Sequence, residues 1–217
     1  MRLGLTVLRL GVAVLVVAAI AATVLEAAGR TTINPFNLFG YFTIQSNIVL
    51  AVVLAIAGVA TLSGRSADQA VLRARACATA YIALVGLVYA VLLAPLGVAG
   101  GVPVPWANTV LHVVTPVYAV LDWAFAPDRR SVPWPTVGLA LVYPAVWSAV
   151  VLIRGATDGW VPYPFLDPTQ GYPVVAGYVL AIAISVAVLA ALAVAVSRVG
   201  RRTGEPSSVM SGRPPAG

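Results

Sequence analysis

The chain has 217 residues, of which 60% are hydrophobic and only 9% are charged. Soluble domains carry about 25% charged residues, so this composition excludes an ordinary soluble globule and indicates a helical membrane protein. The net charge of +6 comes from arginine alone, because the sequence holds no lysine. The arginines stand in short clusters between apolar runs, without the interleaved aromatic and basic patches of nucleic-acid-binding proteins. We therefore expect no nucleic-acid partner.

One cysteine and one histidine exclude further classes of protein. A single cysteine, Cys77, forms neither an intramolecular disulfide nor a thiolate cluster for a metal. Membrane desaturases and hydroxylases need several histidines around iron, and bis-histidine haem proteins need a second one. We therefore expect no metal and no other cofactor.

Six apolar runs are long enough to cross a bilayer, whose ~30 Å hydrocarbon core takes ~20 helical residues. They lie near residues 4–26, 39–62, 74–98, 107–126, 135–153 and 174–197. The sequence thus predicts an all-α fold, a six-helix integral membrane bundle forming one domain over residues 1–198. Residues 199–217 are rich in Pro, Gly and Ser and are expected to form a disordered cytoplasmic tail. For the first run, a cleaved signal peptide is the alternative.

The arginines predict the orientation of the bundle, because cytoplasmic loops carry an excess of basic residues. Of the 13 basic residues, only Arg30 and Arg154 fall in the loops after the first, third and fifth runs. All the others lie at or beyond the opposite ends of the runs. We therefore expect a multi-pass protein of the plasma (inner) membrane with both termini in the cytoplasm. The loops 27–38, 99–106 and 154–173 would then lie outside.

A polar stretch, NPFNLFGYFTIQSN at 34–47, leads into the second apolar run. On a helix, Thr43, Ser46 and Asn47 share one face, whereas Gln45 points elsewhere. Threonine and serine in membrane helices often bond a carbonyl one turn earlier, and asparagine and glutamine join helices. Packing alone is therefore one interpretation of this group, and a reactive hydroxyl at Thr43 is the other.

The only histidine, His112, lies at nearly the same depth as Thr43. Each is about five or six residues into a run that begins on the outer side, which at 1.5 Å per residue places both roughly 6–9 Å below the surface. Two helices that run in the same direction can therefore bring Thr43 and His112 level with each other. A neutral histidine that bonds a neighbouring helix is the structural alternative.

A polar stripe runs through His112 along the fourth run. Its members recur at helical spacing on one face: Asn108, His112, Thr115, Ala119 and Asp122. Pro116 cannot donate a hydrogen bond to the carbonyl of His112, so the backbone there is loosened, and an imidazole beside such a turn suits proton transfer. Asp122 lies about 15 Å further along the helix, too far to orient the imidazole, and we interpret it as a salt-bridged anchor.

Three segments stand out in this order along the chain: YFTIQSN at 41–47, LHVVTPVYAVLDW at 111–123 and RGATDGWVPYPFLD at 154–167. Together they resemble bacterial members of the androgen-induced / androgen-dependent membrane protein family. Animal members of that family are multi-span hydrolases that cleave fatty-acid esters of hydroxy fatty acids with a threonine nucleophile and a histidine. The resemblance assigns these roles to Thr43 and His112.

The predicted function is therefore hydrolysis of lipid (fatty-acyl) esters near the outer leaflet, with Thr43 as nucleophile and His112 as base. The side chains expected to support the oxyanion are Ser46, Asn47, Gln45 and Asn108. The substrate would be a membrane lipid or a lipid-like ester, and the oligomeric state is left open. The alternatives are a non-enzymatic membrane protein that binds lipids or small molecules, a transporter that uses the stripe down to Asp122, and a scaffold.

Overall fold

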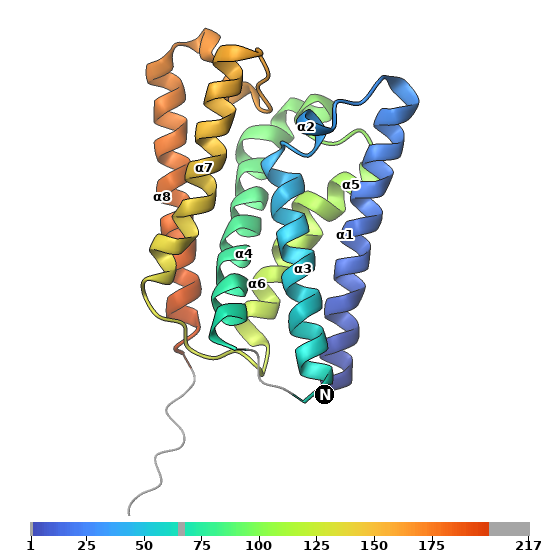
Figure 1. The fold of residues 1–217 in the computed structure, drawn as a ribbon, viewed down its shortest axis with the longest axis vertical. Helices are drawn as coiled ribbons and strands as arrows, with labels where there is room; N and C mark the ends of the chain where they lie inside the picture. Colours follow the sequence, from blue (N-terminus) through green and yellow to red (C-terminus); the bar gives the residue numbers. More distant parts are fainter. Residues whose placement is uncertain (1, 65–67, 200–217) are drawn as a thin grey trace, which may run out of the picture.

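The computed structural model describes residues 2–64 and 68–199, and most of this part of the chain is helical (Figure 1). In chain order the helices and helical turns are α1 (Arg2–Arg30), α2 (Pro35–Leu38), α3 (Phe42–Leu62), α4 (Gln69–Val88), the π-helical turn η1 (Tyr89–Leu93), the 3-10 segment η2 (Ala94–Gly100), α5 (Pro105–Thr109), the π-helical turn η3 (Val110–Val114), α6 (Thr115–Phe125), α7 (Thr136–Thr157), the 3-10 turns η4 (Pro164–Leu166) and η5 (Pro168–Gln170), and α8 (Tyr172–Val196). From residue 200 on, the predicted tail lies outside the described residues.

Within residues 2–64 and 68–199, five helices are long and apolar enough to cross a membrane, which indicates a membrane protein. They are α1, α3, α4 with its continuation to Gly97, α7 and α8. The fourth predicted run is built differently, because α5, η3 and α6 follow one another without a gap from Pro105 to Phe125. The residues at both junctions keep helical backbone angles. At 1.5 Å per residue this rod is about 30 Å long.

Helix α4 lies at the centre of the bundle, where it contacts α3, α6, α7 and α8. Helix α1 packs along α3 on one side, and α7 pairs with α8 on the other (Figure 1). The largest buried apolar cluster is centred on α4, and a second one joins α1, α3 and the start of the α5–η3–α6 rod. This arrangement places the first turn of α3 between α4 and the rod.

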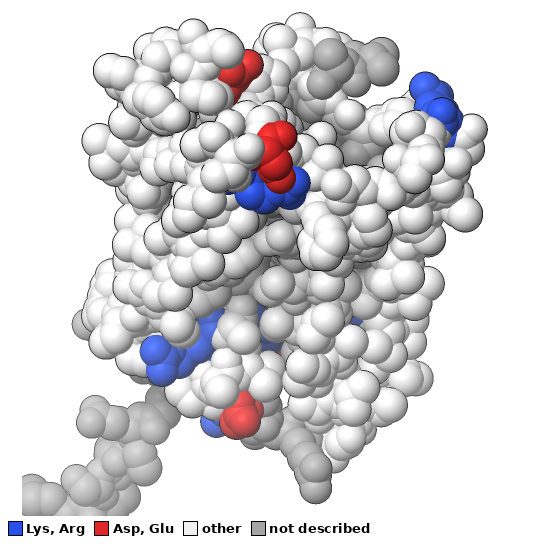
Figure 2. All heavy atoms as spheres, turned by 45° about the horizontal axis from the view of Figure 1, so that its top comes forward, with Lys and Arg blue, Asp and Glu red and all other residues white. Residues whose placement is uncertain are grey.

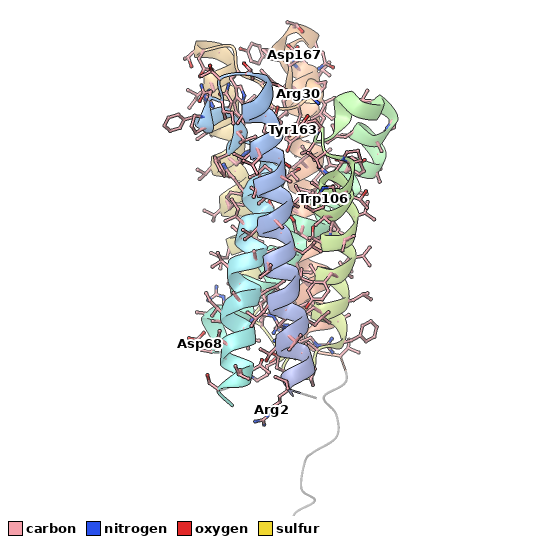
Figure 3. All side chains as sticks on the ribbon, turned by 90° about the vertical axis from the view of Figure 1, so that its right-hand side faces the viewer. Arg2, Arg30, Asp68, Trp106, Tyr163 and Asp167 are labelled. Carbon is pink, nitrogen blue, oxygen red and sulfur yellow. The ribbon has the colours of Figure 1, made fainter. Side chains whose placement is uncertain are left out.

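The two ends of the bundle differ in what they carry. The upper end in Figure 1 holds α2, η2 and the loop 158–171. The lower end holds Arg2 and Asp68, whereas Arg30 and Asp167 lie at the upper end (Figure 3). On the face seen in Figure 2, the charged side chains gather towards the two ends of the molecule. We use "upper end" and "lower end" in this sense below.

Candidate functional site

Thr43 lies in the first turn of α3, where backbone N–H groups have no partner within the helix. Its N–H instead donates to the hydroxyl oxygen of Tyr163 over 3.3 Å. The chain reaches this position through α2, which Asn34 caps by accepting from the N–H of Phe36. Gly40 follows α2, and a Cβ there would lie 2.5 Å from the Trp160 ring. A residue without a side chain is therefore needed where the chain turns into α3.

His112 lies in the π-helical turn η3, and its ring faces Thr43. Its Nδ1 is 3.1 Å from the backbone oxygen of Asn108. A carbonyl oxygen can only accept, so we assign the proton of the neutral imidazole to Nδ1. Nε2 then carries the lone pair, and it lies 3.4 Å from the Thr43 Oγ1. A nucleophile–base pair is often this long before substrate binds.

A second π-helical turn, η1, faces the first one. Its first residue, Tyr89, stacks on the His112 ring with centroids 4.4 Å apart. The amide of Asn108 donates to the Tyr89 hydroxyl over 2.7 Å and its oxygen accepts from the N–H of Val102 over 3.1 Å. π-helical turns occur frequently at functional sites. The two turns together hold the imidazole in one orientation.

Close contact between α4 and the rod depends on Gly86. A Cβ at this position would lie 2.9 Å from the Pro116 Cβ, which is closer than such atoms approach. Pro116 is the second residue of α6, two positions after the end of η3. The sequence predicts a loosened backbone at this proline, and in the structure the residues just before it, including His112, form a π-helical turn.

Tyr163 completes the polar surroundings of the nucleophile, and sequence reasoning missed it. Its hydroxyl lies 3.3 Å from the Thr43 Oγ1. Figure 3 shows Tyr163 just inside the upper end of the bundle, and its ring packs against Tyr41 and Phe165. Burial raises the pKa of Tyr163 to about 12, so the hydroxyl keeps its proton at neutral pH. The one signal in the sequence is its place between two prolines, Pro162 and Pro164, in an outer loop.

The four predicted oxyanion donors have other partners or none. Asn47 donates to the carbonyls of Thr43 and Leu111 over 2.9 and 3.2 Å, so it joins α3 to the rod. Its oxygen accepts from Thr115 over 2.8 Å. Gln45 points away from the site, as predicted. It donates to the carbonyl of Phe39 and accepts from the Tyr143 hydroxyl.

Asn108 and Ser46 complete the set. The Asn108 amide is engaged with Tyr89, and it supports His112 through its backbone oxygen. Ser46 is fully buried, and its hydroxyl has no hydrogen-bond partner among the residues that the structure describes. The polar side chains in contact with the Thr43 hydroxyl are therefore His112 and Tyr163, and not these four.

Two hollows meet at Thr43. The larger, which we call the His112 cavity, has a volume of about 200 Å³ and lies among Thr23, Ala27, Tyr41, Thr43, His112 and Tyr163. The smaller, which we call the α4–α8 pocket, measures about 30 Å³ and includes Thr43, Val88, Tyr163, Phe165 and Ile182 in its walls. Thr43 is only 6% exposed and His112 5%. The reactive atoms thus lie in a largely dry site that adjoins open space on two sides.

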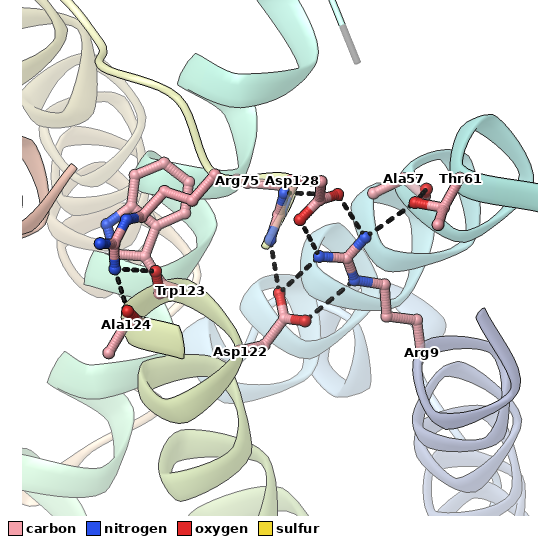
Figure 4. A network of polar contacts seen from close by, with 9 residues as sticks. Arg9, Ala57, Thr61, Arg75, Asp122, Trp123, Ala124 and Asp128 are labelled. Atoms are coloured by element: carbon pink, nitrogen blue, oxygen red, sulfur yellow. Dashed lines mark hydrogen bonds and ion pairs between the residues drawn. The ribbon is translucent and has the colours of Figure 1, made fainter. Parts of the chain in front are cut away.

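Figure 4 shows a buried ion cluster. It lies towards the lower end, away from Thr43, because Arg9 is about two turns along α1 from Arg2. Arg9 bonds Asp122 over 2.9 Å and Asp128 over 2.6 Å, and Arg75 bonds the same two carboxylates over 2.7 and 3.3 Å. The anchor role predicted for Asp122 is confirmed, but its partners are Arg9 and Arg75. This cluster closes the lower end of the stripe that begins at Asn108. No group of three or more metal-ligating side chains occurs among the described residues.

Comparison with protein-family models, curated proteins and solved structures finds no match for this chain. An activity must therefore be argued from the geometry around Thr43. Within 3.4 Å of the Thr43 hydroxyl lie the Nε2 of His112, which carries a lone pair, and the protonated hydroxyl of Tyr163. Such a set suits transfer of an acyl group to the hydroxyl.

Proposed function

We propose that the protein is an integral membrane hydrolase of lipid (fatty-acyl) esters. Thr43 is the nucleophile and His112 the general base. The observation that carries the proposal is the distance of 3.4 Å between the Thr43 Oγ1 and the His112 Nε2. The other ring nitrogen, Nδ1, is hydrogen-bonded to the backbone oxygen of Asn108. That bond fixes the tautomer in which Nε2 accepts a proton.

The reaction runs in two halves. In the first, His112 takes the proton of the Thr43 hydroxyl while Oγ1 attacks the ester carbonyl, and the Tyr163 hydroxyl donates to the resulting oxyanion. The intermediate collapses, His112 gives its proton to the leaving alkoxide, and an acyl-threonine remains. In the second half, His112 takes a proton from water while the water oxygen attacks the acyl-threonine. As the carboxylic acid leaves, His112 returns that proton to the Thr43 Oγ1, which restores the hydroxyl.

The α5–η3–α6 rod is the sixth membrane span in this proposal. Its length of about 30 Å equals the thickness of the hydrocarbon core. The arginine distribution then directs the lower end and both termini to the cytoplasm of the plasma (inner) membrane. The site would lie near the outer leaflet, where an apolar ester can reach it from the side.

Labelling with a fluorophosphonate tests the nucleophile. We expect the purified protein to react at Thr43, because the probe phosphorylates a hydroxyl that an adjacent base activates. Thr43→Val keeps the shape of the side chain but removes the oxygen, so it should take no label, whereas Thr43→Ser should keep labelling. Mass spectrometry of the labelled peptide locates the adduct.

Thr109→Val is the matched control for this labelling. Thr109 is exposed, bonds the carbonyl of Pro105 and lies less than one turn from His112, so its loss should leave labelling intact. Undiminished labelling of Thr43→Val, or an adduct on another residue, would show that Thr43 is not the nucleophile.

Removal of the Tyr163 hydroxyl tests the oxyanion donor. Tyr163→Phe should lower kcat by about 10²–10³-fold with little change in KM, because the bond to the oxyanion is made only in the transition state. Tyr172→Phe, on an exposed ring at the start of α8, should be silent. If both tyrosine variants hydrolyse esters at the wild-type rate, another group serves the oxyanion.

A further inference from the structure

The two hollows at Thr43 are not equivalent with respect to His112. Thr43 and Tyr163 line both of them, so a carbonyl carbon bound at Thr43 has one hollow on each side. Among the described residues, His112 lines only the larger one. The two substituents of an ester carbonyl, the acyl chain and the alcohol oxygen, must therefore be distributed between two chemically different spaces.

Proton transfer decides which substituent goes where. When the tetrahedral intermediate collapses, the alkoxide that leaves must take the proton that His112 holds on Nε2. This transfer needs the leaving oxygen within hydrogen-bond reach of Nε2, on the same side as the imidazole. The alcohol part of the ester thus belongs in the His112 cavity, and the acyl chain belongs in the α4–α8 pocket.

The walls of the hollows agree with this distribution. Apart from Thr43 and Tyr163, the only described residue with a polar side chain on the α4–α8 pocket is Trp147, whose N–H already donates to the carbonyl of Gly40 over 2.8 Å. This pocket therefore suits hydrocarbon. The His112 cavity is larger and includes Tyr41 and the backbone of Gly100 and Gly101. It also includes the Thr23 hydroxyl, which donates to the carbonyl of Ala19 over 2.8 Å and can still accept a hydrogen bond. These groups suit a bulkier and more polar alcohol.

The size of the α4–α8 pocket indicates how a long acyl chain is held. Its volume of about 30 Å³ is small beside the about 200 Å³ of the His112 cavity, so it holds only the first carbons of a chain. Val88 of α4 and Ile182 of α8 line the pocket and are half-buried. Because these two side chains are partly exposed, we expect further carbons to pass between them towards the lipid-facing surface.

From this geometry we infer that the protein takes esters whose acyl chain passes between α4 and α8 and whose alcohol occupies the His112 cavity. The inference rests on the proposed function and adds the direction in which the substrate binds. Val88 and Ile182 then determine acyl-chain selectivity, and Ala27 determines alcohol selectivity.

Two series of chromogenic esters test the direction. One keeps p-nitrophenol as the alcohol and varies the acyl group through acetate, butyrate and octanoate. The other keeps butyrate and compares p-nitrophenol with the bulkier 4-methylumbelliferone. Val88→Phe should lower kcat/KM for octanoate relative to acetate by at least about tenfold and leave the alcohol ratio unchanged. Ala27→Phe should lower kcat/KM for the 4-methylumbelliferone ester relative to the p-nitrophenol ester and leave the ratio of octanoate to acetate unchanged.

Fluorophosphonate labelling of Thr43 serves as the folding control for both variants, and Ile182→Phe replaces Val88→Phe if that protein does not fold. Exchanged effects, with Val88→Phe acting on the alcohol ratio, overturn the inference, as do ratios unchanged in every variant. In either case the wild type still cleaves esters, so the proposed function stands. Absence of both labelling and ester cleavage in the wild type removes the proposed function together with the inference.

Discussion

Glutamine in place of His112 is expected to lower the rate of ester hydrolysis by about 10²–10⁴-fold, the usual contribution of a general base. Glutamine is similar in size and can still bond a carbonyl, but it cannot take the proton of the Thr43 hydroxyl. The neighbouring contacts, with Tyr89 stacked on the ring and the Asn108 carbonyl on Nδ1, leave only Nε2 for this task. Hydrolysis of a p-nitrophenyl ester by the purified protein measures the loss.

Chemical rescue separates a base from a packing residue. In His112→Gly the missing ring leaves space continuous with the His112 cavity of about 200 Å³, so added imidazole has room to bind beside Thr43. We expect imidazole to restore part of the activity of His112→Gly and none of that of Thr43→Val. If His112→Gln keeps a rate within a few fold of the wild type, His112 is a structural histidine and the mechanism fails.

Helix positions and the matching level of Thr43 and His112 along the bundle could be predicted from the sequence, because both depend on local periodicity. The predicted runs 39–62 and 174–197 correspond closely to α3 (Phe42–Leu62) and α8 (Tyr172–Val196). The depth of Thr43 and His112 follows from counting residues at 1.5 Å each. Contact between them requires, in addition, that their helices be neighbours, and only the structure supplies that.

Tyr163 could not be predicted, because the path of a loop is set by tertiary contacts and not by periodicity. The loop 158–171 turns back into the bundle, where Tyr163 packs against Trp147 and Tyr41. The same limit applies to the oxyanion donors. Asn47 shares the face of Thr43, as the helical spacing predicts, but its amide group donates to the carbonyl of Thr43 within α3 and to that of Leu111 in the rod.

The ion-pair partners of Asp122 could not be predicted from the sequence either, because they too depend on tertiary packing. Arg9 is visible in the sequence as a charge inside the first apolar run, and such a charge needs a partner. Its choice of Asp122 and Asp128 depends on the packing of α1 against the rod, more than a hundred residues away along the chain. The sequence therefore indicates that these charges are paired, and the fold decides with which partner.

Loss of the Asp122 carboxylate should destabilise the protein by about 3–5 kcal/mol, the typical result of removing one member of a buried ion pair. The cluster contains two guanidinium groups and two carboxylates, and the side chains of Arg9, Arg75 and Asp122 are at most 5% exposed. Asp122→Asn keeps the shape but leaves an excess positive charge in this dry environment. Unfolding in mixed detergent micelles gives the free energy of unfolding, and Arg75→Met together with Asp122→Leu should recover part of the loss.

The exposed pair Glu26–Arg30 at the upper end provides the matched control. It joins residues one turn apart on α1, with side chains 37% and 67% exposed, so Glu26→Gln should cost no more than about 0.5 kcal/mol.

The buried ion cluster also predicts that stability depends on pH. Burial alone would raise the pKa of Asp128, but Arg9 and Arg75 hold it below its ordinary value of 3.8. Its contribution to stability is therefore complete above that value and is lost as the pH falls further. Equal effects of Asp122→Asn and Glu26→Gln would mean that the buried charges do not hold α1, α4 and the rod together.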